Sequence, residues 1–366
     1  MPTFRYANPF VIHWGAGCVE RELIEELGRL GAKRVLLVTT RSAVLDARLA
    51  PAVESILGER TAGRVTIGEH APASSIMAAA QAARSLGADA LVSLGGGSPI
   101  DGAKAAAFAL ASSLDLAAPG AAERARGVQL SRVLPHVAIP TTLSAAELSS
   151  SAGFSATGTR EKVGVASPLL CPAAVFYDEE MAVRTPLALW LSTGLRAVDH
   201  AVETLLVPGE HPLPHTTALE GLRRLRSGLL SVHARPADPH SRHACQIGAW
   251  LSYLLPGAAA RGLSHTLGKR LGSRHGIPHG VTSCLLLPHV LRYLAPRAPG
   301  AMVRIADALG GVEAASAVGD LIAELELPQH LAAFNLSEAD LVEAVRPLAG
   351  AEHPLGELLE ILRAAW

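Results

Sequence analysis

Residues 91–107, LVSLGGGSPIDGAKAAA, carry the clearest structural signal in the first half of this chain. A short apolar run ends in three glycines and a serine, and a segment of helical composition follows near residue 99 or 100. Glycine lets the backbone approach a ligand closely, and the N–H groups at the start of a helix favour an anion. Ser98 is suited to cap this helix and to donate to a phosphate. The pattern predicts a strand, a phosphate-binding turn and a helix.

Two further apolar runs end in polar residues. RVLLVTT (34–40) ends at Thr39 and Thr40 and is followed by Arg41, and HVAIPTT (136–142) ends at Thr141 and Thr142. Continuous apolar strands that alternate with helices predict a parallel sheet covered on both faces. Ligands of such sheets bind beyond the carboxyl ends of the strands. We therefore expect a nucleotide at the glycine turn, although the ordinary GxGxxG spacing is absent.

The pattern changes in the second half of the chain. Strand signals fade from about residue 179, and Ala/Leu-rich segments of helical period continue to residue 366. A chain of 366 residues exceeds the size at which a single core usually stops growing. We expect an α/β dinucleotide-binding domain over residues 1–170 and an all-helical domain over residues 171–366.

Composition excludes several functional classes. Apolar residues make up 49% and charged residues 18% of the chain, which is typical of a globular protein rather than a disordered one. A net charge of −1 argues against nucleic acid or an anionic membrane as the main partner. The four cysteines form no CxxC pair, which favours a reducing compartment. No basic and apolar leader is visible in the first ten residues, so we expect a cytoplasmic protein.

Several separated motifs occur together in one order along the chain. They are GGGSPIDGAK (95–104), IPTT (139–142), EKVGVASPLLCP (161–172), TGLRAVDHAVE (193–203) and GIPHGVTSCLLLPHV (276–290). This set resembles the iron-containing (group III) alcohol dehydrogenase family over essentially the whole chain. The resemblance implies an active site in a cleft between the two domains, NADPH or NADH as cofactor, and a homodimer.

The resemblance also assigns cofactor positions. The residues that match the family's cofactor-lining positions are Gly95, Gly96, Gly97, Ser98, Asp101, Thr141, Thr142 and Lys162. Thr40 stands where NAD-preferring members often have an aspartate for the ribose hydroxyls. A neutral Thr40 followed by Arg41 does not repel a 2′-phosphate and can help to bind it. We therefore expect NADPH to be accepted, alongside NADH.

The family's metal ligands are an aspartate, a histidine four residues later, and two histidines fourteen residues apart. His200, His265 and His279 match the three histidines, but Arg196 stands at the aspartate position. Residues four apart share one face of a helix, so Arg196 directs a permanent cation toward the place of the metal. An arginine cannot be deprotonated to act as a ligand. The resemblance, with this departure, predicts that no catalytic metal is bound.

A second departure lies ten residues before His279. The family usually has another histidine there, often assigned to proton transfer, and this chain has Lys269. His275, at a position that is often aromatic in relatives, is equally compatible with packing and with a site. The maleylacetate reductase branch, which works without metal, is the nearest in resemblance. Its members typically have asparagine at the ligand position, so Arg196 departs from that branch too.

A cleft holding Arg196, Lys269, His200, His265 and His279 is cationic and suits a small anionic oxo-acid or enone. We expect Arg196 to anchor a carboxylate or stabilise an enolate, Lys269 to donate a proton, and NAD(P)H to supply hydride. Two alternatives stay open. One is a metal-dependent alcohol dehydrogenase in which Asp199, Glu203 or water completes the ligand set. The other is a non-redox enzyme that uses the cationic pocket for elimination or cyclisation.

Overall fold

The computed structural model describes residues 4, 6, 8–157, 162–255 and 262–366. The chain divides into two compact units, with the division between Thr185 and Pro186. The boundary expected after residue 170 is therefore too early. A strand at Ala174–Tyr177 and a short helix at Glu179–Ala182 still belong to the first unit, because that strand pairs within its sheet.

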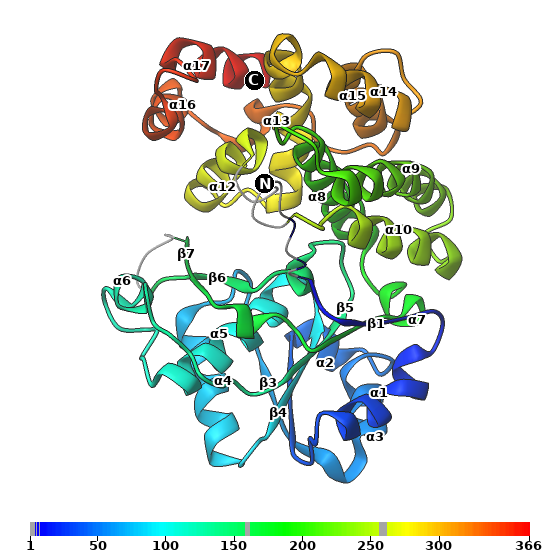
Figure 1. Ribbon diagram of the computed structural model, residues 1–366, viewed down its shortest axis with the longest axis vertical. Helices are drawn as coiled ribbons and strands as arrows, with labels where there is room; N and C mark the ends of the chain where they lie inside the picture. Colours follow the sequence, from blue (N-terminus) through cyan, green and yellow to red (C-terminus); the bar gives the residue numbers. More distant parts are fainter. Residues whose placement is uncertain (1–3, 5, 7, 158–161, 256–261) are drawn as a thin grey trace. The chain divides into compact units, whose positions relative to one another are not determined.

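The first unit is built on a six-stranded sheet in the order β1-β8-β5-β4-β2-β3, and every pairing is parallel (Figure 1). The strands are β1 (Val11–Trp14), β2 (Val35–Thr39), β3 (Thr61–Thr66), β4 (Ala90–Gly95), β5 (His136–Pro140) and β8 (Ala174–Tyr177). The edge strand β1 was not anticipated, because its four residues carry no apolar run longer than two.

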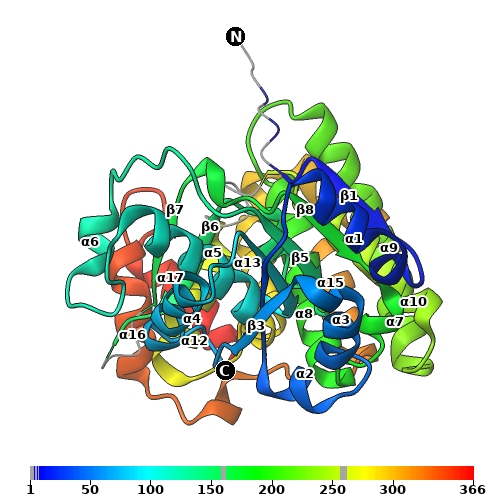
Figure 2. The same ribbon diagram turned by 90° about the horizontal axis from the view of Figure 1, so that it is seen from below.

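Helices cover both faces of this sheet. Figures 1 and 2 show α1 (Cys18–Arg29) and α3 (Ala50–Leu57) on one face, and α4 (Ala73–Ser85) and α5 (Gly97–Ser112) on the other. The position of β2 between two cores explains why its sequence is apolar throughout. Its residues alternate between the two cores, with Val35 and Leu37 toward α1 and α3, and Leu36 and Val38 toward α4 and α5. The expected parallel sheet with two covered faces is confirmed.

A small antiparallel sheet lies beside α5 and was not predicted. It pairs β6 (Ser151–Ser155) with β7 (Lys162–Ala166). Asp101 ties α5 to this sheet, since its Oδ2 accepts the N–H of Gly153 at 3.1 Å. Asp101 Oδ1 also lies 2.8 Å from Nζ of the fully buried Lys104, which in turn donates to the carbonyl of Ala146 at 2.8 Å. Both charged side chains thus have structural partners inside the first unit.

The described part of the second unit, from Pro186 on, is helical and contains no strand. Its longer helices are α8 (Leu187–Leu205), α9 (Pro212–Ala234), α10 (Pro239–Leu251), α12 (Leu263–His275), α13 (His279–Leu294), α14 (Pro299–Ala308), α15 (Ala314–Glu324), α16 (Glu338–Val345) and α17 (Leu355–Ala364). Within the ranges described, no helix combines the length and apolar character needed to cross a membrane.

Glycines allow three of these helices to pack at short range. A Cβ atom on Gly280 of α13 would overlap the backbone of Ser192 in α8, and one on Gly268 of α12 would lie 2.6 Å from Oγ1 of Thr282 in α13. Real Cβ atoms do not come so close to other heavy atoms. The close approach places the polar residues of α8 directly against α12 and α13.

A buried acid between the two sheets of the first unit makes stability depend on pH. Glu147 lies in the short helix Ala146–Leu148, is 1% exposed, and accepts the hydroxyl hydrogen of Tyr177 at 2.9 Å through Oε1. Burial raises the pKa of the Glu147 carboxyl from 4.5 to about 7. Because the folded-state pKa is the higher one, the stability linked to this proton is present below pH 4.5 and is lost as the pH rises through about 7.

Glu147→Gln is therefore expected to flatten the stability profile. The wild type should lose about 3 kcal/mol of unfolding free energy between pH 4.5 and pH 8 through this group, and the variant should not. Urea unfolding at both pH values measures the difference. Glu59→Gln, at an exposed position, is the control that should leave the slope unchanged. Equal slopes in wild type and Glu147→Gln would show that Glu147 is ionised throughout this range.

Candidate active site

The polar ends of three neighbouring strands meet at one edge of the first unit's sheet. Thr39 Oγ1, at the end of β2, donates to the carbonyl of Leu94 in β4 at 2.9 Å. The N–H of Thr141, just beyond β5, donates to the carbonyl of Gly95 at 2.9 Å. The apolar runs that end in polar residues thus come together around the glycine turn, as the strand ends of a parallel sheet should.

The glycine turn has the shape of a phosphate site. Gly95 has a φ of 137°, a conformation that residues with a Cβ rarely adopt. A Cβ on Gly96 would lie only 3.0 Å from Cγ2 of Thr142. Helix α5 begins at Gly97, earlier than expected, and no side chain caps its N-terminus. The backbone N–H groups of the first turn therefore stay available to an anion.

Ser98 does not cap α5, so that prediction is wrong. It is the second residue of the helix, and its Oγ accepts the N–H of His70 at 3.1 Å, which leaves its own hydroxyl hydrogen to donate. Thr142 Oγ1 and Ser144 Oγ are buried beside the turn and have no hydrogen-bond partner among the residues that the structure describes. Hydroxyls of this kind, next to an uncapped helix start, fit the diphosphate of a dinucleotide.

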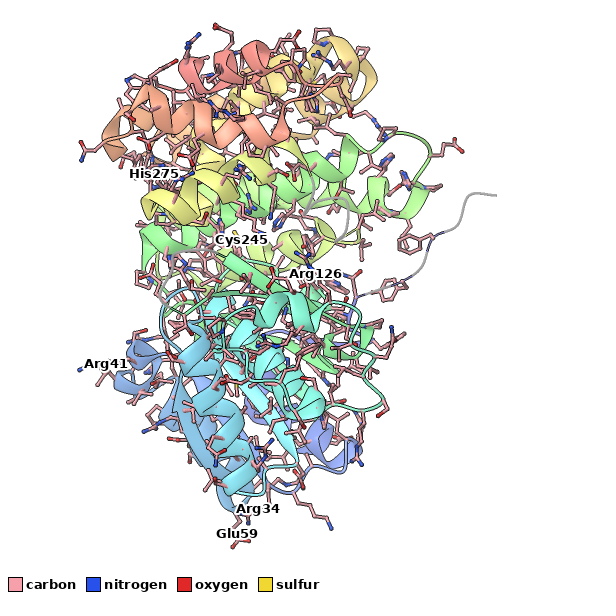
Figure 3. The ribbon with its side chains drawn as sticks, turned by 90° about the vertical axis from the view of Figure 1, so that its left-hand side faces the viewer. Arg34, Arg41, Glu59, Arg126, Cys245 and His275 are labelled. Atoms are coloured by element: carbon pink, nitrogen blue, oxygen red, sulfur yellow. The ribbon has the colours of Figure 1, made fainter. Side chains whose placement is uncertain are left out.

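The remaining predicted cofactor positions, Thr40, Arg41 and Lys162, differ in their structural surroundings. Thr40 caps α2 (Arg41–Leu45), because its Oγ1 accepts the N–H of Ala43 at 3.3 Å. A Cβ on Gly95 would lie 3.6 Å from Cγ2 of Thr40, so Thr40 stands at the turn. Arg41 is exposed and points away from the ribbon (Figure 3). Lys162 opens β7, but its side chain lies outside the described residues.

In the second unit, the guanidinium of Arg196 joins three helices. Arg196 belongs to α8 and is 5% exposed. Its Nη1 donates to Oδ2 of Asp199 at 3.1 Å and to Oγ of Ser283 in α13 at 2.9 Å. Its Nη2 donates to Nδ1 of His265 in α12. Three of the five N–H groups of this cation thus have partners within the second unit, and the anchoring of a substrate carboxylate by Arg196 stays a prediction.

Asp199 is the counter-charge of Arg196. Besides the guanidinium, its Oδ2 accepts the hydroxyl hydrogens of Ser264 at 3.0 Å and Ser283 at 2.7 Å. Burial raises the pKa of the Asp199 carboxyl, and Arg196 is the strongest opposing influence. Nothing in the sequence marked Ser264 or Ser283 as polar partners, since serines are frequent and only packing of α12 and α13 on α8 brings these two together.

Glu203, near the end of α8, is a structural acid whose carboxyl group binds the start of α12. Its Oε1 accepts the N–H of His265 at 2.9 Å, in the first turn of a helix whose N-cap, Gly262, offers no side chain. A Cβ on Gly262 would overlap the Glu203 carboxyl. Burial raises the pKa of Glu203 well above its usual range, and the charge of Asp199 raises it further.

The three histidines lie in the same region of the second unit. The ring of His200 is buried, 4.5 Å from the ring of Tyr253 and 6.2 Å from that of His265, measured between centroids. Burial, and next the charge of Arg196, lowers the pKa of both His200 and His265 well below the usual value. His279 is the first residue of α13, and its charge also disfavours protonation of His265. Tyr253 had no sequence signal that linked it to His200.

Lys269 and His275 share helix α12 but differ in surroundings. Lys269 is exposed and follows His265 by four residues, so the two lie on one face of the helix. Its charge acts on His265. His275, labelled in Figure 3, lies at the end of α12 with Nε2 at 3.8 Å from Oδ1 of Asp340. His275 therefore packs toward α16 and is not part of the cluster around Arg196.

The residues around Arg196 do not fit a divalent metal. A guanidinium can only donate, so Nδ1 of His265 must accept, and the neutral ring then carries its proton on Nε2. Neither ring nitrogen keeps a lone pair for a metal in that state. Over the described ranges, no three histidine, cysteine, aspartate or glutamate side chains are arranged to hold a metal ion. Asp199 Oδ2 already accepts three hydrogen bonds, so the alternative in which Asp199 completes the ligand set leaves only its Oδ1, which is buried without a hydrogen-bond partner among the described residues.

Comparison with known proteins gives a consistent result for both units. The profile of the iron-containing alcohol dehydrogenases matches residues 9–179, and the C-terminal profile of the same family matches residues 190–353. Maleylacetate reductase from Pseudomonas sp. (strain P51) is 33% identical over 350 residues, which are 95% of this chain and 91% of that protein. Maleylacetate reductase from Burkholderia cepacia is 33% identical over 88% of this chain and 84% of its own. The crystal structure of maleylacetate reductase from Agrobacterium tumefaciens superimposes with a TM-score of 0.84 at 30% identity, covering 100% of this chain and 99% of that one.

Proposed function

Because the chain belongs to the iron-containing alcohol dehydrogenase family and is an NAD(P)-dependent oxidoreductase, we propose that it reduces an activated C=C or C=O bond without a catalytic metal. One observation carries this proposal. At the position of the family's aspartate ligand, the guanidinium of Arg196 is bonded to His265 and balanced by Asp199. A built-in cation with its own counter-ion takes the place that a dication would need.

The substrate that we propose is a small unsaturated oxo-acid or enone that carries a negative charge. Maleylacetate, named for the relatives at 33% identity, belongs to this class. Since the charge of Arg196 is offset by Asp199, the exposed ammonium of Lys269, one turn after His265 on α12, is the cation that we propose attracts a carboxylate. We therefore assign to Lys269 the binding of the substrate carboxylate, a role that was first expected of Arg196.

NAD(P)H bound at the glycine turn would supply hydride to one carbon of the double bond. The uncapped start of α5 and the hydroxyls of Thr142 and Ser144 would hold its diphosphate. Reduction then needs one proton. Lys269 can give that proton from its ammonium group. The product gains one hydride and one proton, and NAD(P)⁺ is released.

Deuterium transfer tests the proposal. The protein is incubated with NADPH or NADH deuterated at C4 of the nicotinamide, and with maleylacetate and related oxo-acids and enones. Mass spectrometry of the product should show one deuterium on carbon for each cofactor oxidised. Product formed without deuterium would instead establish the non-redox alternative, in which the cationic residues promote elimination or cyclisation. Cofactor oxidation only after added metal would establish the metal-dependent alternative.

Arg41 should favour the phosphorylated cofactor. An exposed guanidinium next to Thr40 can pair with a 2′-phosphate, and no carboxylate at position 40 repels it. Arg41→Ala is expected to raise the KM for NADPH about tenfold and to leave the KM for NADH within about twofold. Steady-state kinetics with both cofactors measures this, with Arg48→Ala, beyond the end of α2, as a control. A large NADH preference in the wild type would contradict this reading of Thr40 and Arg41.

A further inference from the structure

We infer that Arg196 is a positioning residue that locks His265 in the tautomer with its proton on Nε2, and that this Nε2–H donates to an oxygen of the substrate. The inference rests on the proposed function for the identity of the ligand. The tautomer itself rests only on the geometry within the second unit.

The donor decides which nitrogen carries the proton. Arg196 Nη2 lies in hydrogen-bond contact with Nδ1 of His265, and a guanidinium has no acceptor atom. Nδ1 must therefore present its lone pair to Arg196. With Nδ1 accepting this hydrogen bond, the ring proton of the neutral imidazole belongs on Nε2.

Both ends of His265 are anchored by α8. Its backbone N–H donates to Oε1 of Glu203 at 2.9 Å, and its ring accepts from Arg196. Arg196 is itself held by Asp199 at 3.1 Å and by Ser283 at 2.9 Å. The ring is thus fixed by a chain of buried contacts before any ligand binds, which is the preorganisation that a catalytic donor needs.

The second ring nitrogen is the one that we assign to a ligand. His265 is half-buried, and no hydrogen bond of its Nε2 is found within the part of the chain that the structure describes. Lys269 follows on the same face of α12. A neutral N–H beside an ammonium can stabilise the oxygen on which negative charge develops when hydride adds to an activated double bond. Here His265 is a donor rather than the metal ligand that its position in the family implies.

Nitrogen NMR of protein labelled with [¹⁵N]histidine tests the tautomer without any assay of activity. The His265 resonances are assigned by their loss in His265→Gln. We expect an unprotonated Nδ1 and a protonated Nε2 near neutral pH in metal-free protein. In Arg196→Lys, which keeps a cation but loses the planar fork, we expect a mixture of both tautomers. A protonated Nδ1 in the wild type would overturn the inference.

Kinetics test the donor role. His265→Gln keeps an N–H donor, and His265→Leu has none. We expect His265→Leu to lose about 10²–10³-fold in kcat with the KM for the cofactor unchanged, and His265→Gln to keep kcat within about tenfold of the wild type. Equal losses in both variants would refute the donor role. Absence of any cofactor oxidation by the wild type would refute the proposed function, while the NMR result would still decide the tautomer.

Discussion

Arg196→Met is expected to destabilise the protein by about 3–5 kcal/mol, the largest effect on stability that we foresee for a single substitution. Methionine fills similar space but leaves Asp199 as an unpaired carboxylate that is fully buried. Ser283 and the His265 ring each also lose a hydrogen bond from α8. Urea unfolding followed by tryptophan fluorescence measures the loss.

Two further variants separate the buried charge from the lost packing. Arg196→Met combined with Asp199→Asn should recover about half of the loss or more, because no uncompensated charge stays buried. Arg274→Met removes an arginine of α12 that pairs with Glu343 at the surface, and it should cost less than about 1 kcal/mol. If Arg196→Met were as mild as Arg274→Met, the guanidinium would not be the internal counter-ion described here.

Lys269→Ala is expected to lower kcat/KM for an anionic oxo-acid by about 10²–10³-fold, the largest effect on activity. The reason is that this substitution removes both the cation that attracts the carboxylate and the proposed proton donor. Lys269 is exposed, so the fold should be unaffected, which circular dichroism and thermal unfolding can verify. Steady-state assays at several pH values measure the loss and its pH dependence.

A conservative variant divides these two roles of Lys269. Lys269→Arg keeps the charge but not an acidic proton, so KM should stay near the wild-type value while kcat falls. Arg274→Ala, one to two turns further along α12, should change neither constant by more than about twofold. Wild-type kcat in Lys269→Ala would assign the proton to water or to another group.

The first unit was largely predictable from sequence because its signals are local. An apolar strand followed by glycines and a helix constrains the backbone within about twenty residues, and Thr39 and Thr141 end strands that a parallel sheet must align. The start of α5 was misjudged because Ser98 is a good capping residue by type. Its hydroxyl is instead used by the N–H of His70, a contact between positions 28 residues apart.

The site in the second unit was only half predictable. The spacing of His200, His265 and His279, together with Arg196, signalled a departure from a metal site. The sequence could not show that Arg196 turns inward to Asp199 and His265, because this depends on how α12 and α13 pack on α8. In the sequence, an arginine opposite histidines suggests a substrate anchor. Only the structure shows which of its N–H groups already have partners.

Metal content decides whether Arg196 stands in the place of a metal ion. The protein is purified from cells grown with added zinc and iron, dialysed against buffer without chelator, and analysed by inductively coupled plasma mass spectrometry. With Arg196 bonded to Nδ1 of His265, we predict far less than one metal ion per chain. Near-stoichiometric zinc or iron would contradict the account, because it would require Arg196 to leave His265 and the histidines to act as ligands.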